Sequence, residues 1–147
     1  MIEDVELILA TPCETVINTD LTLKLLRCYS KLYLGGEQPR WCARSQREYY
    51  RKLKLNGLEM ATLYENAKDR TFKINYKGIL HISSPKIGVL TLNCELISDE
   101  MAIDFLNKGI FQEENFTVLP KNYNFVPIEE KTIEIQPLKK GRKAKNK

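Results

Sequence analysis

The sequence lacks any apolar run close to the roughly 20 residues that a membrane-spanning helix requires. Its opening segment, Met1–Glu6, is acidic, whereas a secretory signal peptide begins with basic residues. We therefore expect an intracellular protein without a membrane partner. The composition, with 43% hydrophobic and 29% charged residues, is that of an ordinary globular domain.

Histidine and closely spaced cysteines are also scarce. The only histidine is His81, and the cysteines Cys13, Cys28, Cys42 and Cys94 form no C-x-x-C pair. Zinc sites of the finger type draw ligands in close pairs, so we expect neither a metal nor another cofactor. In a reducing compartment such cysteines behave as small buried hydrophobic side chains, although Cys28 and Cys42 would face each other in an antiparallel hairpin.

Motifs of the common enzyme classes are missing. The chain has no G-x-S-x-G, no H-E-x-x-H and no glycine-rich phosphate loop. A Ser-His-Asp triad would depend on His81, which lies within the apolar alternation of an expected strand. Asp99 and Glu100 are adjacent carboxylates placed where the positive end of a helix favours them. We expect a non-enzymatic protein, with a hydrolase centred on His81 as an alternative.

Positive charge is concentrated at the C-terminus. The net charge of the chain is +4, from 23 Lys and Arg against 19 Asp and Glu. Residues 139–147 contain no acidic side chain and six basic ones: Lys139, Lys140, Arg142, Lys143, Lys145 and Lys147. Without these six, residues 1–138 have 17 basic and 19 acidic side chains, a net charge of −2. We expect a disordered basic tail that contacts an acidic protein surface or nucleic acid, although many lysine-rich termini only improve solubility.

The N-terminal region, residues 1–69, is predicted to be mainly helical. Residues 2–9 alternate in part and predict a strand. Helical spacing of leucines predicts a helix over residues 20–34, which Gly35 and Gly36 would end. A second helix is predicted from Pro39 or Arg40 to Lys68, so that residues 20–68 would form a helical hairpin.

The second predicted helix has two distinct faces. Its apolar face consists of Cys42, Gln46, Tyr49, Tyr50, Leu53, Gly57 and Met60, and its opposite face of Arg44, Arg47, Arg51 and Lys54. The basic face suggests a surface that contacts the phosphates of a nucleic-acid backbone. Nucleic-acid bases would then stack on Trp41, Tyr49 and Tyr50. The alternative is a solvated helix face with both tyrosines buried behind it, and the angular positions favour this alternative for the tyrosines. Gly57 predicts a kink or a close helix contact.

Residues 70–138 are predicted to form a small α+β region. Period-two alternation predicts strands at 72–76, 79–82 and 89–94, which would form an antiparallel meander. Ser98 is a good N-cap for a helix ending at Lys108 and Gly109, whose apolar stripe would cover the sheet. A last strand is predicted over residues 132–135. The fold class is therefore α+β: a helical hairpin, a small antiparallel sheet packed with one helix, and a flexible basic tail.

Two stretches of the sequence resemble segments of known proteins. Trp41–Tyr50 resembles a Cys-x-x-Ser/Cys-x-Arg segment, and Gly88–Asn93 followed by Ser98–Leu106 resembles a strand-then-helix module. Both are similar to segments of small uncharacterised proteins of tailed phages of Bacteroidetes, including the crAss-like phages. The resemblance implies a phage genome and a virion or assembly role, with localisation in the virion or the host cytoplasm. No active site is implied.

These observations lead to two functional hypotheses. The first is a non-enzymatic structural or assembly protein of a tailed-phage virion, which acts through contacts with other protein subunits in an oligomeric assembly and through its basic tail. The alternative is a nucleic-acid-binding regulator that uses DNA- or RNA-contacting residues on helix 40–54, namely Arg44, Arg47, Arg51 and Lys54, together with the tail.

Overall fold

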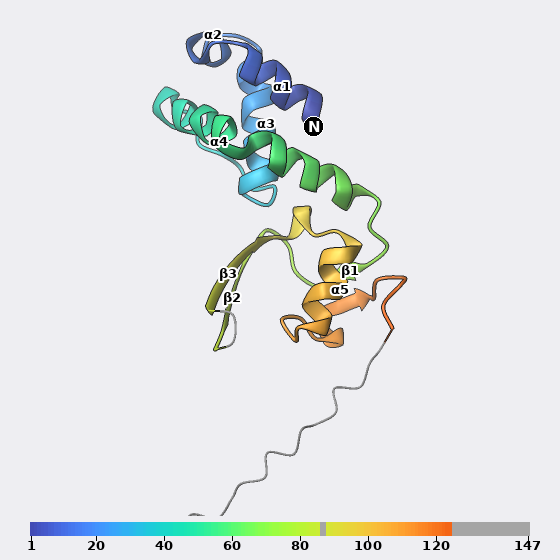
Figure 1. The fold of residues 1–147 in the computed structure, drawn as a ribbon. Coiled ribbons are helices and arrows are strands. Elements are labelled where there is room, and N and C mark those ends of the chain that lie inside the picture. Colours follow the sequence, from blue (N-terminus) through green and yellow to red (C-terminus); the bar gives the residue numbers. More distant parts are fainter. Residues whose placement is uncertain (86–87, 125–147) are drawn as a thin grey trace, which may run out of the picture.

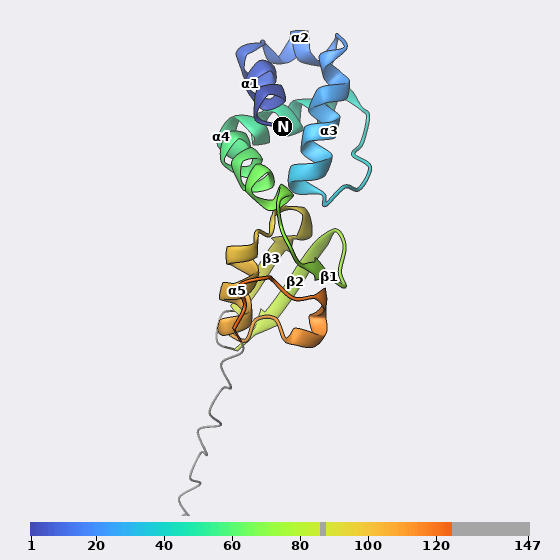
Figure 2. The same cartoon turned by 90° about the vertical axis from the view of Figure 1, so that its right-hand side faces the viewer.

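A computed structural model describes residues 1–85 and 88–124 of the chain, and it confirms the α+β class. Four helices come first, as Figure 1 shows: α1 (Ile2–Ala10), α2 (Cys13–Ile17), α3 (Leu21–Tyr33) and α4 (Ala43–Lys68). Strands β1 (Lys73–Ile74), β2 (Ile79–Ser84) and β3 (Gly88–Asn93), the short 3-10 helix η1 (Cys94–Leu96), helix α5 (Asp99–Asn107), the 3-10 helix η2 (Glu113–Asn115) and strand β4 (Phe116–Val118) follow. Figure 2 shows α1–α4 at one end of the molecule and the strands with α5 at the other.

The N-terminal segment is helical, so the prediction of a strand over residues 2–9 is wrong. Val5 and Ile8 are fully buried and stand one helical turn apart. Glu3 and Asp4 occupy the first turn, where the helix dipole favours negative charge. The alternation that suggested a strand includes Leu7, which is 44% exposed and faces away from the core.

Helices α3 and α4 follow one another and pack together, joined by residues 34–42, and α1 and α2 pack against them. Gly35 and Gly36 have φ values of +59° and +89°, which explains why α3 ends before them. Helix α1 runs along α4, because the Met1 amine pairs with Glu65 at 3.1 Å and the Tyr50 hydroxyl donates to the Thr11 carbonyl at 2.8 Å. Helix α4 begins at Ala43, three residues later than the latest predicted start.

Helix α4 is kinked at its centre, next to the glycine that predicted it. Asn56 has φ −149° and ψ 17°, and the Tyr33 hydroxyl donates to its side-chain oxygen at 2.7 Å. A Cβ atom on Gly57 would lie 2.9 Å from Leu53 Cδ2 and 3.3 Å from Val5 Cγ1. The kink and the close contact between α1 and α4 both occur at this point.

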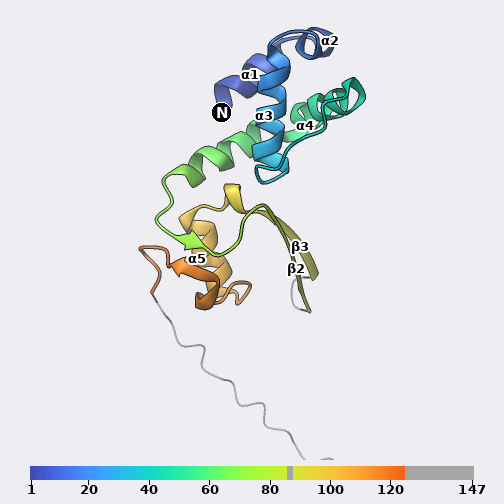
Figure 3. The ribbon, with the colours of Figure 1, turned by 180° about the vertical axis from the view of Figure 1, so that it is seen from behind.

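The strands form two separate pairs, so the predicted three-stranded meander is wrong. Strand β2 pairs antiparallel with β3, from Ile79 opposite Asn93 to Ser84 opposite Gly88. Strand β1 pairs instead with β4, far along the chain. Asn75 directs this change of partner, because its backbone N–H and side-chain amide donate to carbonyls of the η2 turn at 2.9 and 3.0 Å. In Figures 1 and 3 the β2–β3 pair projects to one side of α5, and β1 and β4 overlap α5 in both views.

Helix α5 confirms the predicted helix and its N-cap. The Ser98 hydroxyl accepts a hydrogen bond from the Met101 N–H at 3.4 Å, and Gly109 follows the helix with φ +69°. Ala102 and Leu106 of α5 are buried with Phe72, Leu92, Ile97, Phe111 and Phe116. Three of these rings, Phe72, Phe111 and Phe116, make edge contacts with centroids 5.6 to 5.7 Å apart.

The two buried clusters meet at η1. The helical cluster contains core side chains of α1–α4 and also Leu96 of η1, whereas the second cluster runs from Phe72 to Phe116. Within the described residues, no helix is long and apolar enough to cross a bilayer. The predicted strand at 132–135 and the basic tail at 139–147 lie outside the described residues, and the predicted boundary between residues 69 and 70 stays a prediction.

Candidate functional site

The basic face of α4 is turned to solvent, but its four residues are not equivalent. The Arg47 guanidinium donates to both carboxylate oxygens of Glu14 on α2, at 2.8 and 3.0 Å. This pair lowers the pKa of Glu14 and raises that of Arg47, chiefly through the side-chain hydrogen bonds. Arg44 is 3.6 Å from Glu48 and its side chain is 90% exposed. Arg51 and Lys54 are exposed and have no ion-pair partner among the residues described.

The aromatic residues near this face do not form a stacking platform. Tyr49 is buried and its ring stacks on Tyr29 with a centroid distance of 3.9 Å. Tyr50 uses its hydroxyl to hold the end of α1. The burial of Tyr49 and the partial burial of Tyr50 agree with the angular positions noted in the sequence. Trp41 alone of the three is largely exposed, at 60%.

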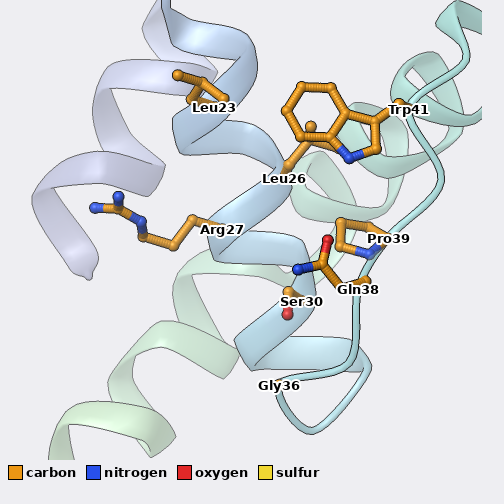
Figure 4. A pocket seen from close by; sticks show the side chains of 8 residues that line it. All are labelled: Leu23, Leu26, Arg27, Ser30, Gly36, Gln38, Pro39 and Trp41. Carbon is orange, nitrogen blue, oxygen red and sulfur yellow. The ribbon is translucent and has the colours of Figure 1, made fainter.

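An open groove lies between α3 and the segment that leads into α4. Its volume is about 340 Å³, and Figure 4 shows the residues that line it: Leu23, Leu26, Arg27, Ser30, Gly36, Gln38, Pro39 and Trp41. The Trp41 indole and the Pro39 ring line one side, and α3 lines the other. Leu23 is 56% exposed at the end of the groove nearest Trp41, and Arg27 extends from α3 away from the indole.

The segment that carries Trp41 is held by hydrogen bonds at both ends. The Tyr49 hydroxyl accepts from the Arg40 N–H at 2.9 Å, and the Gln46 side-chain amide donates to the Trp41 carbonyl at 2.5 Å. At the other end the Ser30 hydroxyl donates to the Glu37 carbonyl at 2.6 Å. The backbone of Trp41 is therefore fixed on α4 while its indole stays in solvent. An exposed aromatic side chain on a fixed backbone is typical of protein contact sites.

The sequence did not predict this groove. It indicated Trp41 only as a stacking partner for bases, and it indicated neither Leu23 nor Arg27. One signal was present, because Leu23 falls off the stripe formed by the buried residues Leu25, Cys28 and Leu32. A leucine off the apolar stripe of an amphipathic helix is exposed unless a partner covers it.

The four cysteines are all free thiols, in different environments. Cys28 and Cys94 are buried as expected, and burial raises their pKa, for Cys28 to about 11. The expectation of burial is wrong for Cys42, which is exposed at the N-cap of α4. Its sulfur is 3.0 Å from the Ser45 hydroxyl, and hydrogen bonds from the Ser45 side chain and backbone lower its pKa.

The candidate acid and base residues have structural contacts. His81 is exposed on β2, and its Nδ1 lies 3.1 Å from the Thr91 hydroxyl on β3. Asp99 in the first turn of α5 accepts hydrogen bonds from the Thr71 N–H at 2.8 Å and the Thr71 hydroxyl at 2.7 Å. Asp99 therefore joins the start of α5 to the segment before β1.

Comparison with protein-family models, with curated proteins and with solved structures finds no match for this chain.

Proposed function

We propose that this chain is a non-enzymatic assembly protein of a tailed-phage particle, which acts by docking on other protein subunits. The observation that carries the proposal is the groove beside Trp41. A tryptophan that is 60% exposed and a leucine that is 56% exposed, both next to a groove, form a surface that gains stability when a partner covers it. The phage context comes from the sequence resemblance described above.

The chemistry of the groove defines the kind of partner segment it fits. The indole of Trp41, the Pro39 ring and Leu23 suit an aliphatic or aromatic anchor. Arg27 is exposed at the rim and extends away from the indole, so a partner that continues across α3 would bring an acidic residue to it. The partner is therefore expected to present an apolar anchor and, separated from it by the width of α3, a carboxylate.

Particle purification tests the proposal. Phage particles assembled with the wild-type chain should retain it through density-gradient purification, and a Trp41→Ala variant should be retained at least about tenfold less if the indole is a hot spot of the contact. Val89→Ala is the matched control, because Val89 is 77% exposed on the distant β2–β3 pair. Complete, infective particles that lack the chain would contradict the virion role, and unchanged retention of Trp41→Ala would contradict the groove.

Nucleic-acid binding is the second candidate function, supported by the exposed Arg51 and Lys54. These two side chains, with Arg44, leave positive charge on the outer face of α4 that Glu14 does not neutralise. Six further positive charges lie in residues 139–147. Arg47 contributes less than the sequence suggested, because its guanidinium is already bonded to a carboxylate.

A salt titration with duplex DNA tests this candidate. When binding depends on phosphate contacts, the logarithm of the association constant falls linearly with the logarithm of the salt concentration. The slope reports the number of phosphate contacts. Replacing Arg51 and Lys54 by glutamine should reduce the slope by about two if α4 binds, whereas deleting residues 139–147 should reduce it if the tail binds. Arg47→Gln serves as the control with a smaller expected effect. The absence of salt-sensitive binding in the wild-type chain would exclude this function.

A further inference from the structure

The groove beside Trp41 has an apolar part and a cationic part on different sides of α3. The Trp41 indole and the Pro39 ring line the side toward the segment before α4, and Arg27 extends from α3 away from the indole (Figure 4). A helix with its side chains is about 10 to 12 Å wide. An extended chain advances about 3.3 Å per residue, so a segment that crosses α3 brings the third or fourth residue after its apolar anchor to Arg27.

Arg27 is the cation of α3 that is left for a partner. Lys24 and Lys31 bond to side chains of α1 and α4, at 2.8 and 3.1 Å. Arg27 is exposed and has no ion-pair partner among the residues that the structure describes. In the segment before Trp41, the exposed Arg40 and Glu37 offset each other, and no acidic residue lines the groove. The groove therefore favours an apolar segment that carries negative charge.

Residues 125–130, with the sequence Phe-Val-Pro-Ile-Glu-Glu, have this order of side chains. They follow directly on Asn124, the last residue that the structure describes. Glu129 stands three residues after Val126, which is the spacing that the groove requires. Proline favours an extended conformation of the residue before it, so Pro127 suits a segment that lies extended across a groove.

The position of these residues in the chain favours the groove of another copy over their own. Tyr123 packs against the second buried cluster, among the strands and α5. The groove belongs to the helical end of the molecule, and Figure 2 shows the two ends apart. Val126 follows Tyr123 by three residues and reaches at most about 11 Å beyond it. Because each copy has one groove and one such segment, the contact joins copies head to tail.

We propose that residues 125–130 of one copy dock in the groove of a second copy. Val126 lies against the Trp41 indole, and Glu129 lies beside Arg27. This inference rests on the proposed function, because it names the occupant of the same groove. A segment of this length buries less than the roughly 1,200 Å² of a standard interface, so the association is weak and depends on concentration.

Sedimentation velocity and tryptophan fluorescence of the full-length chain, from about 1 to about 200 µM, test the contact over the range expected of a small interface. Trp41 is the only tryptophan of the chain, so its emission reports the groove alone. The mass of the wild-type chain should rise with concentration, and its emission should shift to shorter wavelength as the indole leaves water. Val126→Asp should lose at least about tenfold in affinity, because a carboxylate replaces the apolar anchor. Val89→Asp, the same change at a valine that is 77% exposed on β3, is the matched control and should behave like the wild-type chain.

A mixture of two variants tests the head-to-tail arrangement. A Trp41→Ala chain keeps the segment but lacks the indole, and a Val126→Asp chain keeps the groove but lacks the anchor. Neither should associate alone, whereas the mixture should form one-to-one dimers, since one intact groove and one intact segment remain. All tryptophan emission then comes from the intact groove and should shift on mixing. Circular dichroism checks that both variants keep the fold.

Charge reversal tests the pairing with Arg27. Arg27→Glu, and separately Glu129→Arg together with Glu130→Arg, should each weaken association about three- to tenfold by placing like charges together. A chain with all three changes restores opposite charges and should recover the wild-type affinity to within about threefold.

Four results would overturn the proposal: a wild-type chain that stays monomeric at the highest concentration, a Val126→Asp chain that associates normally, a mixture that does not associate, or a triple charge variant that is not restored. Wild-type emission that is already shifted relative to Val126→Asp at the lowest concentration, and that does not change with concentration, would also overturn it and would assign the segment to its own groove. Failure of this inference is distinguishable from failure of the proposed function. If the chain does not associate with itself but Trp41→Ala is lost from purified particles, the groove binds a different subunit.

Discussion

The backbones of Gly35 and Gly78 pass each other at a distance that excludes a side chain. A Cβ atom on Gly35 would lie 2.4 Å from Cα and 2.5 Å from the carbonyl carbon of Gly78. Gly35 follows α3 and Gly78 precedes β2, and both have positive φ. The Gly78 carbonyl also accepts a hydrogen bond from the Cys94 N–H at 3.0 Å. This contact joins the end of the helical part to the start of the β2–β3 pair.

Gly35→Ala should be strongly destabilising. The new methyl group meets backbone atoms that cannot rotate away, and alanine is also strained at φ +59°. We expect a loss of about 3 kcal/mol in the free energy of unfolding, measured by urea denaturation. Gly36→Ala is the control, because its φ is also positive but no atom lies within 4 Å of the added Cβ. It should cost only the conformational strain of about 1 to 2 kcal/mol. Equal losses in the two variants would show that the close approach contributes nothing.

Asn93 should be a second critical residue at the same junction. Its buried side-chain amide donates to the carbonyls of Lys31 and Leu32 at 2.8 and 3.0 Å, and its oxygen accepts from the Glu95 N–H at 3.0 Å. Asn93→Ala leaves these groups without their partner and should lower the free energy of unfolding by about 2 to 4 kcal/mol. Asn66→Ala, on the exposed side of α4, should change it by less than about 0.5 kcal/mol. A similarly small effect for Asn93→Ala would contradict this role.

Cys42 should be the most reactive of the four thiols. Hydrogen bonds from Ser45 lower its pKa, so a larger fraction is thiolate near neutral pH, whereas burial raises the pKa of Cys28 to about 11. In the native protein, iodoacetamide should modify Cys42 first, with a rate that rises as pH passes through the lowered pKa. Ser45→Ala should shift this pH profile upward. Peptide mapping identifies the modified residue, and initial labelling at Cys13, which is less exposed and has a raised pKa, would refute the expectation.

The ion pair between Asp4 and Lys24 should make stability depend on pH. The Lys24 ammonium, 2.8 Å from Asp4 Oδ1, lowers the pKa of Asp4 below its ordinary value of 3.8. A carboxyl group with a lowered pKa in the folded state stabilises the fold above its unfolded pKa, and this contribution is lost as pH falls through the folded value. Asp4→Asn should therefore cost up to about 1 kcal/mol at pH 7, because both side chains are partly exposed. The difference between variant and wild type should shrink as pH falls below 3.8 and through the lowered pKa of the folded state, and a difference that does not shrink would show that it is not ionic.

Elements governed by local spacing could be predicted from the sequence. Helix α3 matches the leucine periodicity, and α5 begins after Ser98 as its capping residue indicated. The kink in α4 lies next to Gly57. In each case the decisive residues are within a few positions of one another, so local chemistry determines the outcome.

Other features depended on residues far apart in the chain and were mispredicted or missed. The segment Ile2–Ala10 is a helix because α1 buries Val5 and Ile8 against α4. Strand β1 pairs with β4 rather than β2 because Asn75 bonds to the η2 turn. The groove beside Trp41 exists because Tyr49 and Gln46 of α4 hold the segment before it. Contacts between distant segments override the local preference of a segment for helix or strand. The spacing of residues within a segment does not predict such contacts.

By itself, the sequence determined the α+β class, the helical first half, the basic face of α4 and the concentration of six positive charges in residues 139–147. Those properties follow from the periodicity and the charge of the side chains, and both can be read directly from the amino-acid sequence. Only the tertiary structure decided that Arg47 is neutralised by Glu14, that Tyr49 is buried on Tyr29, and that Trp41 and Leu55 remain exposed. Exposure and pairing depend on which segments meet in space, so the surfaces available to partners appear only in the folded chain.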